Sequence, residues 1–503
     1  MTTPTLRGTV ARAAAALAVA TVITSCAVQA QTPAAGAAPP DPFTVQNLIG
    51  DAVSLSNQAY PDVEKAIQRF KNSDPEGARG YLEQARKQYP KLPPTELSMA
   101  KLHLFNRDEQ NGRAQLEQTV MKSPDDPEAY LLLADMAFTQ GRTTESAALF
   151  DVADGLVQKF TENEKRRKNF DIRVLAGRSA VLERRLKWDQ ANALLAKWVA
   201  IDPDSANAHT RLGITLARLK KPAEAFEEFR KARDLRPDSP HPYVMLGQIY
   251  SSENDVEKAR EAFEKAYAEE PKGEGTARAY AEWLIQQNEL DKAQKVADAM
   301  RLATPDSIVA LTLDGVVAKM RNQPKEAEEA LMRVLALDPA NAGATNLLAL
   351  ILGESSNTAD QERALSYAQL NAQRFPQNSQ TNITHAWILY KLGRAQEGAV
   401  ALQRGGQAGN INADTAYLVA RIMIQQNQRD QAKKALEEVL TRAGAGMFMY
   451  RKESEALLKE LGGEVPKPPA AGTTPAVTTS VPPAPGADPP TSPATGAAPP
   501  PGQ

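Results

Sequence analysis

The middle of the chain contains two stretches of equal length that match position by position. Residues 206–239 read ANAHTRLGITLARLKKPAEAFEEFRKARDLRPDS, and residues 240–273 read PHPYVMLGQIYSSENDVEKAREAFEKAYAEEPKG. The matching positions include Leu212 and Leu246, Gly213 and Gly247, Ala225 and Ala259, Phe229 and Phe263, Ala232 and Ala266, and Pro237 and Pro271. A fixed period of 34 residues indicates a stack of similar supersecondary units. The sequence therefore predicts an array of repeats.

The period continues in both directions from this pair. Prolines that lie 34 residues apart are found at 90 and 124, and again at 203, 237, 271, 305 and 339. An 11-residue insertion near 161–171 and a 3-residue insertion around 353–361 account for the two irregular spacings. The predicted repeats therefore begin at residues 59, 93, 127, 172, 206, 240, 274, 308, 342, 379 and 413, and together they span 59–446.

Each repeat has the pattern of two helices. In the repeat that begins at 240, Tyr243, Leu246 and Tyr250 recur at helical spacing, a polar turn follows at 251–255, and a second apolar helix ends near Pro271. Proline lacks an amide donor and disfavours helix in the residue before it, so it separates one repeat from the next. A single helix pair cannot bury its apolar face, and neighbouring pairs must stack to form a continuous core.

This order of a Leu-Gly pair, a tyrosine, and then Ala, Phe, Ala and Pro at fixed offsets resembles the tetratricopeptide repeat. The match is close at 206–273 and weaker in the last two repeats, where Gly398, Gly405 and Gly444 stand at positions that usually hold Ala or Pro. The resemblance covers about three quarters of the chain. It implies an all-α fold, a right-handed solenoid of about eleven helix-turn-helix repeats, whose inner face of first helices binds peptides or proteins.

Composition and motifs argue against nucleic-acid binding and against catalysis. A net charge of −2 argues against nucleic acid as a partner, because phosphate binding needs a basic surface. The chain has neither a phosphate-binding GxxxxGK[ST] loop nor a GxSxG nucleophile motif, and no pair of histidines has HExxH spacing. The four histidines are His103, His209, His241 and His385. We therefore expect a protein that is not an enzyme, with no catalytic residue, metal site or cofactor.

The first 30 residues have the features of an export signal. Arg7 and Arg12 precede a short apolar core at Ala13–Ile23, and small residues follow. Two processing sites compete: an ordinary cut after Ala30, and a lipobox in which Cys26, the only cysteine, becomes lipidated. Both predict an exported protein of the periplasm or cell envelope, and the second adds attachment to a membrane. The mature repeats can form no disulfide.

The segments that flank the repeats are of different kinds. Residues 31–42 are predicted to form a spacer, residues 43–58 an amphipathic N-terminal capping helix, and residues 447–461 a C-terminal capping helix. Residues 462–503 hold 13 of the 35 prolines, and this composition predicts a disordered tail.

Two groups of residues are candidates for binding a partner. In the tetratricopeptide family, the second, fifth, ninth and twelfth positions of a repeat tend to point inward. The candidates at such positions are Gln248, Arg278, Glu282, Trp387, Tyr390, Tyr417 and Arg421. Aromatic and Arg residues are frequent interface anchors, although Trp387 and Tyr417 can instead pack against neighbouring helices. The carboxylate clamp of the family needs Lys and Asn at the fifth and ninth positions, and no repeat has that pair.

The second group is a basic stretch at the longer insertion. It comprises Lys165, Arg166, Arg167, Lys168 and Arg173, followed by Arg178, Arg184, Arg185 and Lys187, against only Asp171 and Glu183. Such a stretch either binds an acidic partner or an anionic lipid surface, or is the solvated extension of a helix.

Three functions are consistent with these features. The first is an exported scaffold that binds protein or peptide partners on the inner face of the solenoid. The second is a structural spacer in the cell envelope. The third is a non-catalytic subunit of an envelope assembly or export machine.

Overall fold

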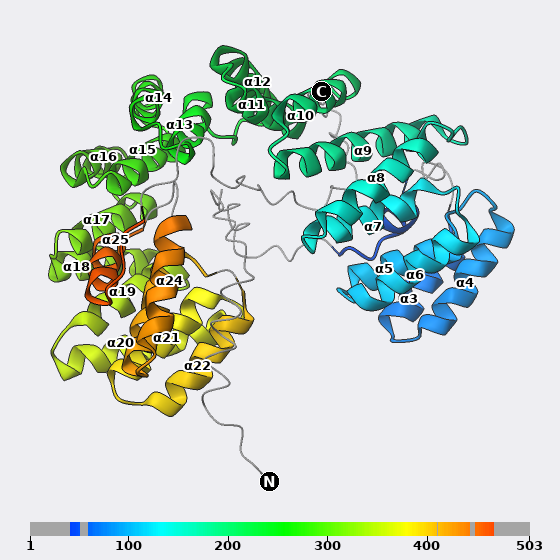
Figure 1. The fold of residues 1–503 in the computed structure, drawn as a ribbon. Coiled ribbons are helices and arrows are strands. Elements are labelled where there is room, and N and C mark those ends of the chain that lie inside the picture. Colours follow the sequence, from blue (N-terminus) through cyan, green and yellow to red (C-terminus); the bar gives the residue numbers. More distant parts are fainter. Residues whose placement is uncertain (1–40, 51–58, 410, 443–447, 467–503) are drawn as a thin grey trace, which may run out of the picture. The chain divides into compact units, whose positions relative to one another are not determined.

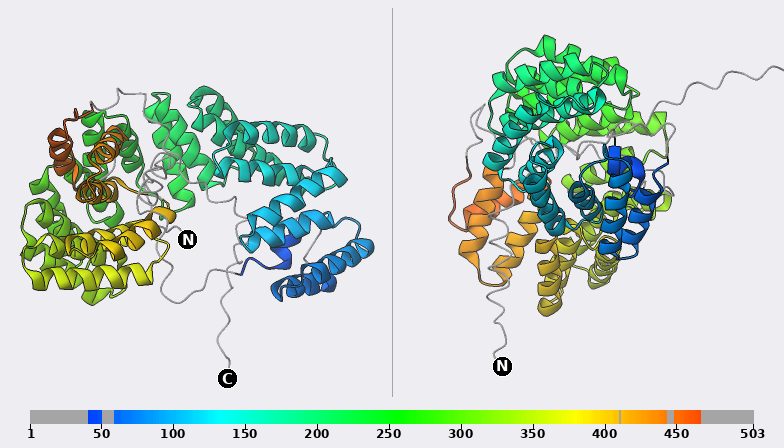
Figure 2. Two further views of the ribbon diagram at one scale, coloured as in Figure 1. Left: turned by 60° about the horizontal axis from the view of Figure 1, so that its bottom comes forward. Right: turned by 90° about the vertical axis from the view of Figure 1, so that its right-hand side faces the viewer.

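The computed structural model describes residues 41–50, 59–409, 411–442 and 448–466. The predicted signal segment with Cys26, nearly all of the spacer and most of the Pro-rich tail lie outside the described residues. Within those residues every regular element is a helix, and the helices form successive antiparallel pairs (Figures 1 and 2). The prediction of an all-α fold built from about eleven helix pairs is confirmed.

The helix pairs follow one another along the chain with short turns between their two members. They are α3 (Pro61–Lys71) and α4 (Pro75–Gln88), α5 (Thr95–Phe105) and α6 (Glu109–Lys122), α7 (Pro127–Thr139) and α8 (Thr143–Val157), α9 (Glu164–Arg184) and α10 (Trp188–Ile201), α11 (Ala206–Arg218) and α12 (Pro222–Leu235), α13 (Pro242–Ser252) and α14 (Val256–Glu269), α15 (Glu274–Gln286) and α16 (Leu290–Ala303), α17 (Ile308–Met320) and α18 (Pro324–Leu337), α19 (Ala342–Glu354) and α20 (Thr358–Arg374), α21 (Ser379–Lys391) and α22 (Ala395–Gln407), and α23 (Ala413–Gln425) and α24 (Arg429–Arg442).

Two compact modules divide the described part of the chain at the start of α11. The N-terminal module comprises the described residues up to Ala208, and the C-terminal module comprises those from His209 to 466. A single cluster of buried apolar residues extends through the C-terminal module from Val244 to Leu458. Within the residues that the structure describes, no helix has both the length and the apolarity to span a bilayer.

The periodic prolines lie just beyond the second helices. For example, Pro237 follows the last residue of α12 by two positions, and Pro271 follows the last residue of α14 by two positions. The residue before each of these prolines, Arg236 and Glu270, has left the helical conformation. The prolines therefore end the second helices, as the sequence pattern predicts.

The turn inside a helix pair repeats its backbone conformation as well as its length. In ten of the eleven pairs, one turn residue has positive φ: Ser73, Arg107, Gly141, Leu186, Lys220, Asn254, Asn288, Asn322, Gly393 and Asn427. Glycine and asparagine tolerate this left-handed conformation better than other residues, and they occupy six of the ten positions. The remaining turn, at 355–357, belongs to the pair that carries the 3-residue insertion.

Small residues on the first helices make room for large side chains of the second helices. A Cβ atom on Gly213 would lie 2.6 Å from the ring of Phe229, and one on Gly247 would lie 2.9 Å from the ring of Phe263. The glycines of the Leu-Gly pairs are therefore required by an aromatic ring of the same repeat rather than by contact between two backbones.

Both insertions lengthen a helix. α9 has 21 residues, where α11 has 13, because its N-terminus is extended back to Glu164. α20 has 17 residues, where α18 has 14. The first insertion therefore adds two turns to a first helix, and the second adds nearly one turn to a second helix.

The segments at the two ends of the repeats are shorter helices than the sequence predicts. α2 (Val45–Ile49) ends at Gly50, which has φ 53°, so the helix predicted for 43–58 does not continue through this residue. Residues 51–58 lie outside the described residues. At the other end, α25 (Arg451–Glu460) occupies the place of the second capping helix.

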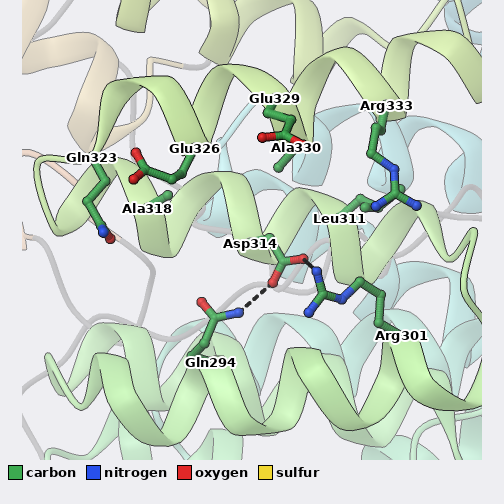
Figure 3. Close-up of a pocket in the computed structure, with 10 residues that line it drawn as sticks. All are labelled: Gln294, Arg301, Leu311, Asp314, Ala318, Gln323, Glu326, Glu329, Ala330 and Arg333. Carbon is green, nitrogen blue, oxygen red and sulfur yellow. Dashed lines mark hydrogen bonds and ion pairs between the residues drawn. The ribbon is translucent and has the colours of Figure 1, made fainter.

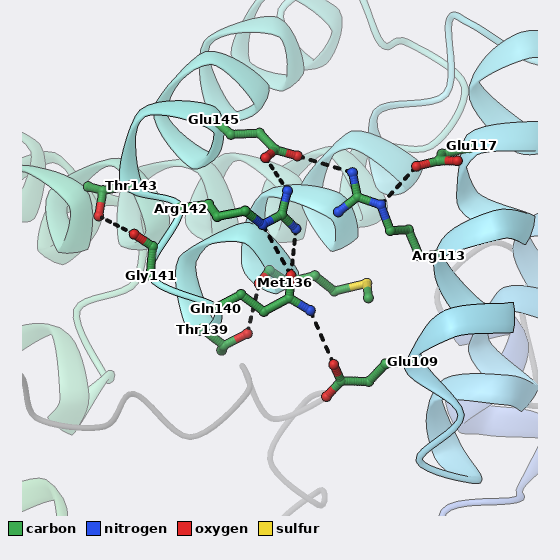
Figure 4. A network of polar contacts seen from close by, with 10 residues as sticks. All are labelled: Glu109, Arg113, Glu117, Met136, Thr139, Gln140, Gly141, Arg142, Thr143 and Glu145. Carbon is green, nitrogen blue, oxygen red and sulfur yellow. Dashed lines mark hydrogen bonds and ion pairs between the residues drawn. The ribbon is translucent and has the colours of Figure 1, made fainter. Parts of the chain in front are cut away.

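Polar contacts link successive pairs of the N-terminal module. Arg113 of α6 donates to Glu117 at 2.8 Å and to Glu145 of α8 at 3.3 Å, and Gln140 donates to Glu109 at 3.2 Å (Figure 4). These side chains are partly exposed, and each such contact contributes at most about 1 kcal/mol. Stability of the stack therefore comes mainly from its apolar core.

Candidate interaction surface on the first helices

Four residues of α21 and α23 form an aromatic surface with two cations, which we call the cation strip: Trp387, Lys391, Tyr417 and Arg421. The guanidinium of Arg421 lies 5.0 Å from the centre of the Trp387 ring, and it donates a hydrogen bond of 2.8 Å to the hydroxyl of Tyr417. The ammonium of Lys391 lies 5.9 Å from the Trp387 ring and donates to the carbonyl of Gly353 at 2.5 Å. The repeats thus bring together residues that are 34 positions apart.

The aromatic candidates on these helices are mostly buried. Trp387 is 4% exposed, Tyr417 is 5% exposed and Tyr390 is 8% exposed. Gln426 donates to the hydroxyl of Tyr390 at 2.5 Å. The rings therefore support the surface, whereas the half-buried Arg421 and Lys391 supply its accessible polar groups.

Neither cation of the strip is neutralised locally. Among the described residues, no carboxylate oxygen lies within 4.0 Å of Lys391 or Arg421. The pKa of Lys391 is lowered, chiefly by burial; the nearby Glu354 opposes this shift and Arg421 adds to it. A partly buried cation without an acidic partner has a desolvation cost that a carboxylate from a bound protein would offset.

The other three candidates lie on earlier first helices. Gln248 is half-buried on α13, while Arg278 and Glu282 are on α15. Arg278 and Glu282 form an ion pair of 3.8 Å with each other. The pKa of Glu282 is raised by burial, against the opposing effect of Arg278. About half of the Glu282 side chain is exposed to solvent.

A second site, which the sequence did not predict, surrounds Tyr450 just before α25. We call it the tyrosine site and define it by Lys319, Glu354, Asp414 and Tyr417, which come from α17, α19 and α23. The hydroxyl of Tyr450 donates to Glu354 at 2.8 Å. Its ring stacks on that of Tyr417, with centroids 4.7 Å apart, and the ammonium of Lys319 lies 4.5 Å from its centre. Tyr450 is only 3% exposed.

The backbone of the same segment is also bound. The amide of Tyr450 donates to the carboxylate of Asp414 at 3.0 Å, and Lys452 donates to Asn288, in the turn before α16, at 3.1 Å. Burial raises the pKa of Asp414 to about 7, although hydrogen bonds from Tyr450 and Met449 and the charge of Lys319 oppose the shift. The C-terminal segment is therefore held by four first helices or their turns, rather than by the last repeat alone.

The inward positions of the repeat would have identified part of this site. Asp414 and Lys319 are at the second and twelfth positions of their repeats. The candidates predicted from the sequence are mainly aromatic and Arg residues, and they include neither Asp414 nor Lys319. Tyr450 lies beyond the last repeat, so the period carried no signal for it.

The basic stretch requires a correction at Arg166. This side chain is buried, and it donates to Glu128 at 2.8 Å and contacts Asp126 at 3.3 Å. Lys101 pairs with the same Glu128, and together these cations lower the pKa of Glu128 to about 2 even though its burial alone would raise it. Arg166 is therefore part of the core and not of an exposed basic surface.

Most of the remaining basic residues have acidic or carbonyl partners from the preceding pair. Arg173 contacts Asp135 at 2.8 Å, Arg178 pairs with Asp151 and Asp154, and Arg184 donates to the carbonyl of Phe138 at 2.9 Å. Lys165, Arg167 and Lys168 are exposed on the added turns of α9. The insertion therefore carries less free positive charge than the local count of residues suggests.

A hollow of about 290 Å³ lies among α16, α17 and α18 (Figure 3). Asp314 at its base accepts a hydrogen bond from Gln294 at 2.7 Å and pairs with Arg301 at 3.1 Å, while Glu326, Glu329 and Arg333 come from α18. The buried carboxylate is thus paired with side chains of the preceding repeat. This hollow is weaker than the first-helix surface as a candidate for recognition.

The histidines do not converge on one another. His103 contacts Asp108 at 3.0 Å, His209 contacts Glu228 at 2.5 Å, and His241 accepts from the amide of Tyr243 at the start of α13. Burial lowers the pKa of His385. Over the part of the chain that the structure describes, no group of three His, Cys, Asp or Glu residues has a geometry that could hold a metal ion.

Solved structures that match the chain have low sequence identity to it. A tetratricopeptide repeat protein from Parabacteroides merdae is 14% identical, with a TM-score of 0.39, and the match covers 51% of this chain and 99% of that one. Yeast Tom70 is 14% identical with a TM-score of 0.37 over 80% and 95% of the two chains, and the pilus biogenesis factor PilW is 19% identical with a TM-score of 0.32 over 46% and 98%. No curated protein matches the chain.

Models of the tetratricopeptide repeat family match four ranges of the sequence. These ranges are 97–159, 204–268, 250–313 and 414–443. Each falls on helix pairs of the structure, in the N-terminal module and at both ends of the C-terminal module. The chain therefore contains tetratricopeptide repeats in these ranges.

Proposed function

We propose that this protein is an exported, non-enzymatic scaffold that binds a protein or peptide partner on the first helices of its C-terminal module. Repeats of this family are interaction modules, and solenoids of stacked pairs offer extended surfaces for binding. The observation that carries the proposal is the cation strip, where Arg421 and Lys391 lie on Trp387 and lack a carboxylate partner among the described residues. We infer that the partner presents an acidic group to this strip.

The strip is tested by removing its charges without removing its rings. The variant Lys391→Gln with Arg421→Gln should lose most of the partner captured from envelope extracts, because charge-assisted contacts at an interface typically contribute about 2 kcal/mol or more. Arg429→Gln with Lys434→Gln is the matched control, since both residues are exposed on α24 and the net charge changes equally. Equal capture by the two variants would refute this location.

Replacing Trp387 by alanine is a poorer test. The ring is 4% exposed, and truncating a buried aromatic side chain costs about 3–5 kcal/mol of stability. Loss of binding in that variant would not separate a lost contact from a disturbed repeat.

The proposal of export rests on the sequence of residues 1–30. We propose a mature protein in the periplasm or cell envelope that begins at Gln31, or at a lipidated Cys26 that attaches it to the membrane. Mass spectrometry of the native N-terminus tests both forms, and an intact Met1 or Thr2 would contradict export. In the same envelope extracts, the absence of any stoichiometric partner would favour a structural spacer, whereas capture of an assembly or export complex would favour a non-catalytic subunit.

A further inference from the structure

The tyrosine site differs from ordinary packing in that it is built from distant repeats. Glu354 is 96 residues before Tyr450, and Asn288 is 164 residues before Lys452. A capping helix needs only to cover the apolar end of the last pair. Here the terminal segment instead meets polar groups on α17, α19 and α23, at positions of the first helices that face it.

The contacts at this site are those by which a protein recognises a tyrosine in a peptide. Glu354 accepts the phenol hydroxyl, Tyr417 and Lys319 contact the ring, and Asp414 accepts the backbone amide. A phenylalanine would remove the hydrogen bond from the phenol to Glu354, which, among the described residues, would keep only its contact with Lys319. A phosphotyrosine would bring its negative charge against two carboxylates, so the site selects the unmodified side chain.

We propose that the tyrosine site is a peptide-binding site for a tyrosine-bearing segment of a protein partner, and that residues 448–460 of the chain occupy it in place of that partner. The inference rests on the proposed function in placing a protein partner on these same helices. The chain's own segment shows which side chain fits, and the adjacent Tyr417 belongs to both the tyrosine site and the cation strip. A partner that also carries a carboxylate would reach Arg421 as well.

Competition with the tethered segment sets the affinity that a partner needs. A short connection gives a tethered ligand an effective concentration on the order of millimolar. A partner of equal affinity at about 1 μM would therefore displace roughly one segment in a thousand. Additional contacts, such as those to the unpaired Lys391 and Arg421, are needed for exchange, and this requirement makes the site selective.

The test uses the full-length chain and a fluorescent synthetic peptide of residues 448–461, FMYRKESEALLKEL. The chain with Tyr450→Ala should bind this peptide at least about tenfold more tightly than the wild type, because its site is no longer filled by the tethered tyrosine. A peptide with phenylalanine at the position of Tyr450 should bind about fivefold more weakly, since it lacks the hydrogen bond to Glu354. A peptide with alanine there should not bind.

Several outcomes would overturn the inference. One is a Tyr450→Ala chain with wild-type helix content that binds the peptide no better than the wild type does. Another is equal binding of the tyrosine and alanine peptides. Concentration-dependent dimerisation of the wild type that Tyr450→Ala abolishes would assign the site to a second copy of this chain instead of a different partner.

A second measurement covers the case in which Tyr450→Ala disturbs folding. In the wild-type chain, millimolar peptide should accelerate hydrogen exchange in residues 451–460 by displacing the tethered segment, and unchanged exchange would overturn the proposal. The two proposals remain distinguishable. Failure of peptide exchange with normal dependence of envelope capture on Lys391 and Arg421 removes only the tyrosine site, and the opposite pattern removes only the cation strip.

Discussion

Replacing Arg166 should destabilise the N-terminal module strongly, whereas replacing the adjacent Arg167 should have almost no effect. The two residues are neighbours in a run of four basic residues, and the local sequence does not distinguish them. In the structure Arg166 is buried against Glu128 and Asp126, while Arg167 is exposed and 4.0 Å from Asp171. We choose glutamine for both changes, so that length and polarity are largely kept and the charge is removed.

The size of the effect follows from the charges that Arg166 leaves behind. Removing one member of a buried ion pair costs about 3–5 kcal/mol. Lys101 remains beside Glu128 and is a larger cause of its lowered pKa than Arg166 is, so we expect the lower part of this range or slightly less, about 2–3 kcal/mol. The guanidinium also lies 4.9 Å from the ring of Phe170, and that contact is lost too. For Arg167 we expect less than about 0.5 kcal/mol.

The pKa values of the two acidic partners of Arg166 shift in opposite directions, and these shifts determine how the stability of the module depends on pH. The pKa of Glu128 falls from 4.5 to about 2, so its contribution to stability is present above pH 4.5 and is lost as the pH falls toward 2. The pKa of Asp126 is raised, chiefly by burial, so its contribution instead declines as the pH rises. Glu128 has the larger set of cationic neighbours, and we expect its effect to dominate: the Arg166→Gln protein should unfold in acid at a higher pH than the wild type.

Hydrogen exchange of α7 and α9 is the suitable assay, because repeat arrays open by segments and a single global free energy is poorly defined. The opening free energy of the protected amides in 127–139 and 164–184 should fall by the stated amounts in Arg166→Gln. Equal changes in the two variants, or a change below about 0.5 kcal/mol in both, would refute the assignment of Arg166 to the core.

Three further predictions concern the turns, the glycines and the tyrosine site. Leu186→Gly should stabilise the chain by about 1 kcal/mol in exchange or denaturant measurements, because Leu186 has φ 57° and is partly exposed; a loss of stability would contradict the strain argument. Gly398→Ala should destabilise α22, since its Cβ would lie 2.8 Å from the Tyr390 ring, whereas Gly80→Ala in α4 has open space and should stabilise by about 0.5–1 kcal/mol; the same sign for both would count against this reasoning. The pKa of Asp414 is raised from 3.8 to about 7, so the native state holds its proton more tightly and loses stability as the pH rises through that interval; amides of 451–460 should be better protected at pH 5 than at pH 8, and Asp414→Asn should remove the difference despite the nearby Lys319, Glu354 and Glu453.

Local pattern was sufficient to predict the repeats. The prolines at 237 and 271, the apolar spacing and the turn residues each act within one helix pair, and the structure places a pair at every predicted repeat. The glycines of the later repeats show the limit of this reasoning. Gly398 and Gly405 depart from the family pattern and suggest weak helices, but a Cβ on either would meet Tyr390 or Ile383. Whether a glycine weakens a helix or admits a neighbour depends on side chains that the pattern alone does not position.

Charge could not be interpreted locally either. The run at 165–168 has a strongly basic composition, yet the acids that neutralise Arg166 lie about 40 residues earlier, on the preceding pair. In a stack of 34-residue units, a side chain on one first helix meets the next first helix one period away. A count of charges within a window of ten residues therefore misses the contacts that decide burial and pairing.

One of the two places where the period is broken supplies a buried charge. The 11-residue insertion supplies Arg166 to the cluster around Glu128. Gly353, whose carbonyl accepts from Lys391, and Glu354, which accepts from Tyr450, are instead the last two residues of α19, a first helix of regular length. Tyr450 itself follows the last repeat. Regular repeats satisfy their backbone and apolar groups in the same way each time. A feature found at only one point of the array therefore comes from an insertion, from a segment beyond the last repeat, or from an unusual residue at a regular position, as with Lys319 and Asp414. For a repeat protein of this kind, a recognition site is thus found by considering both the irregularities in spacing and the unusual residues at regular inward positions.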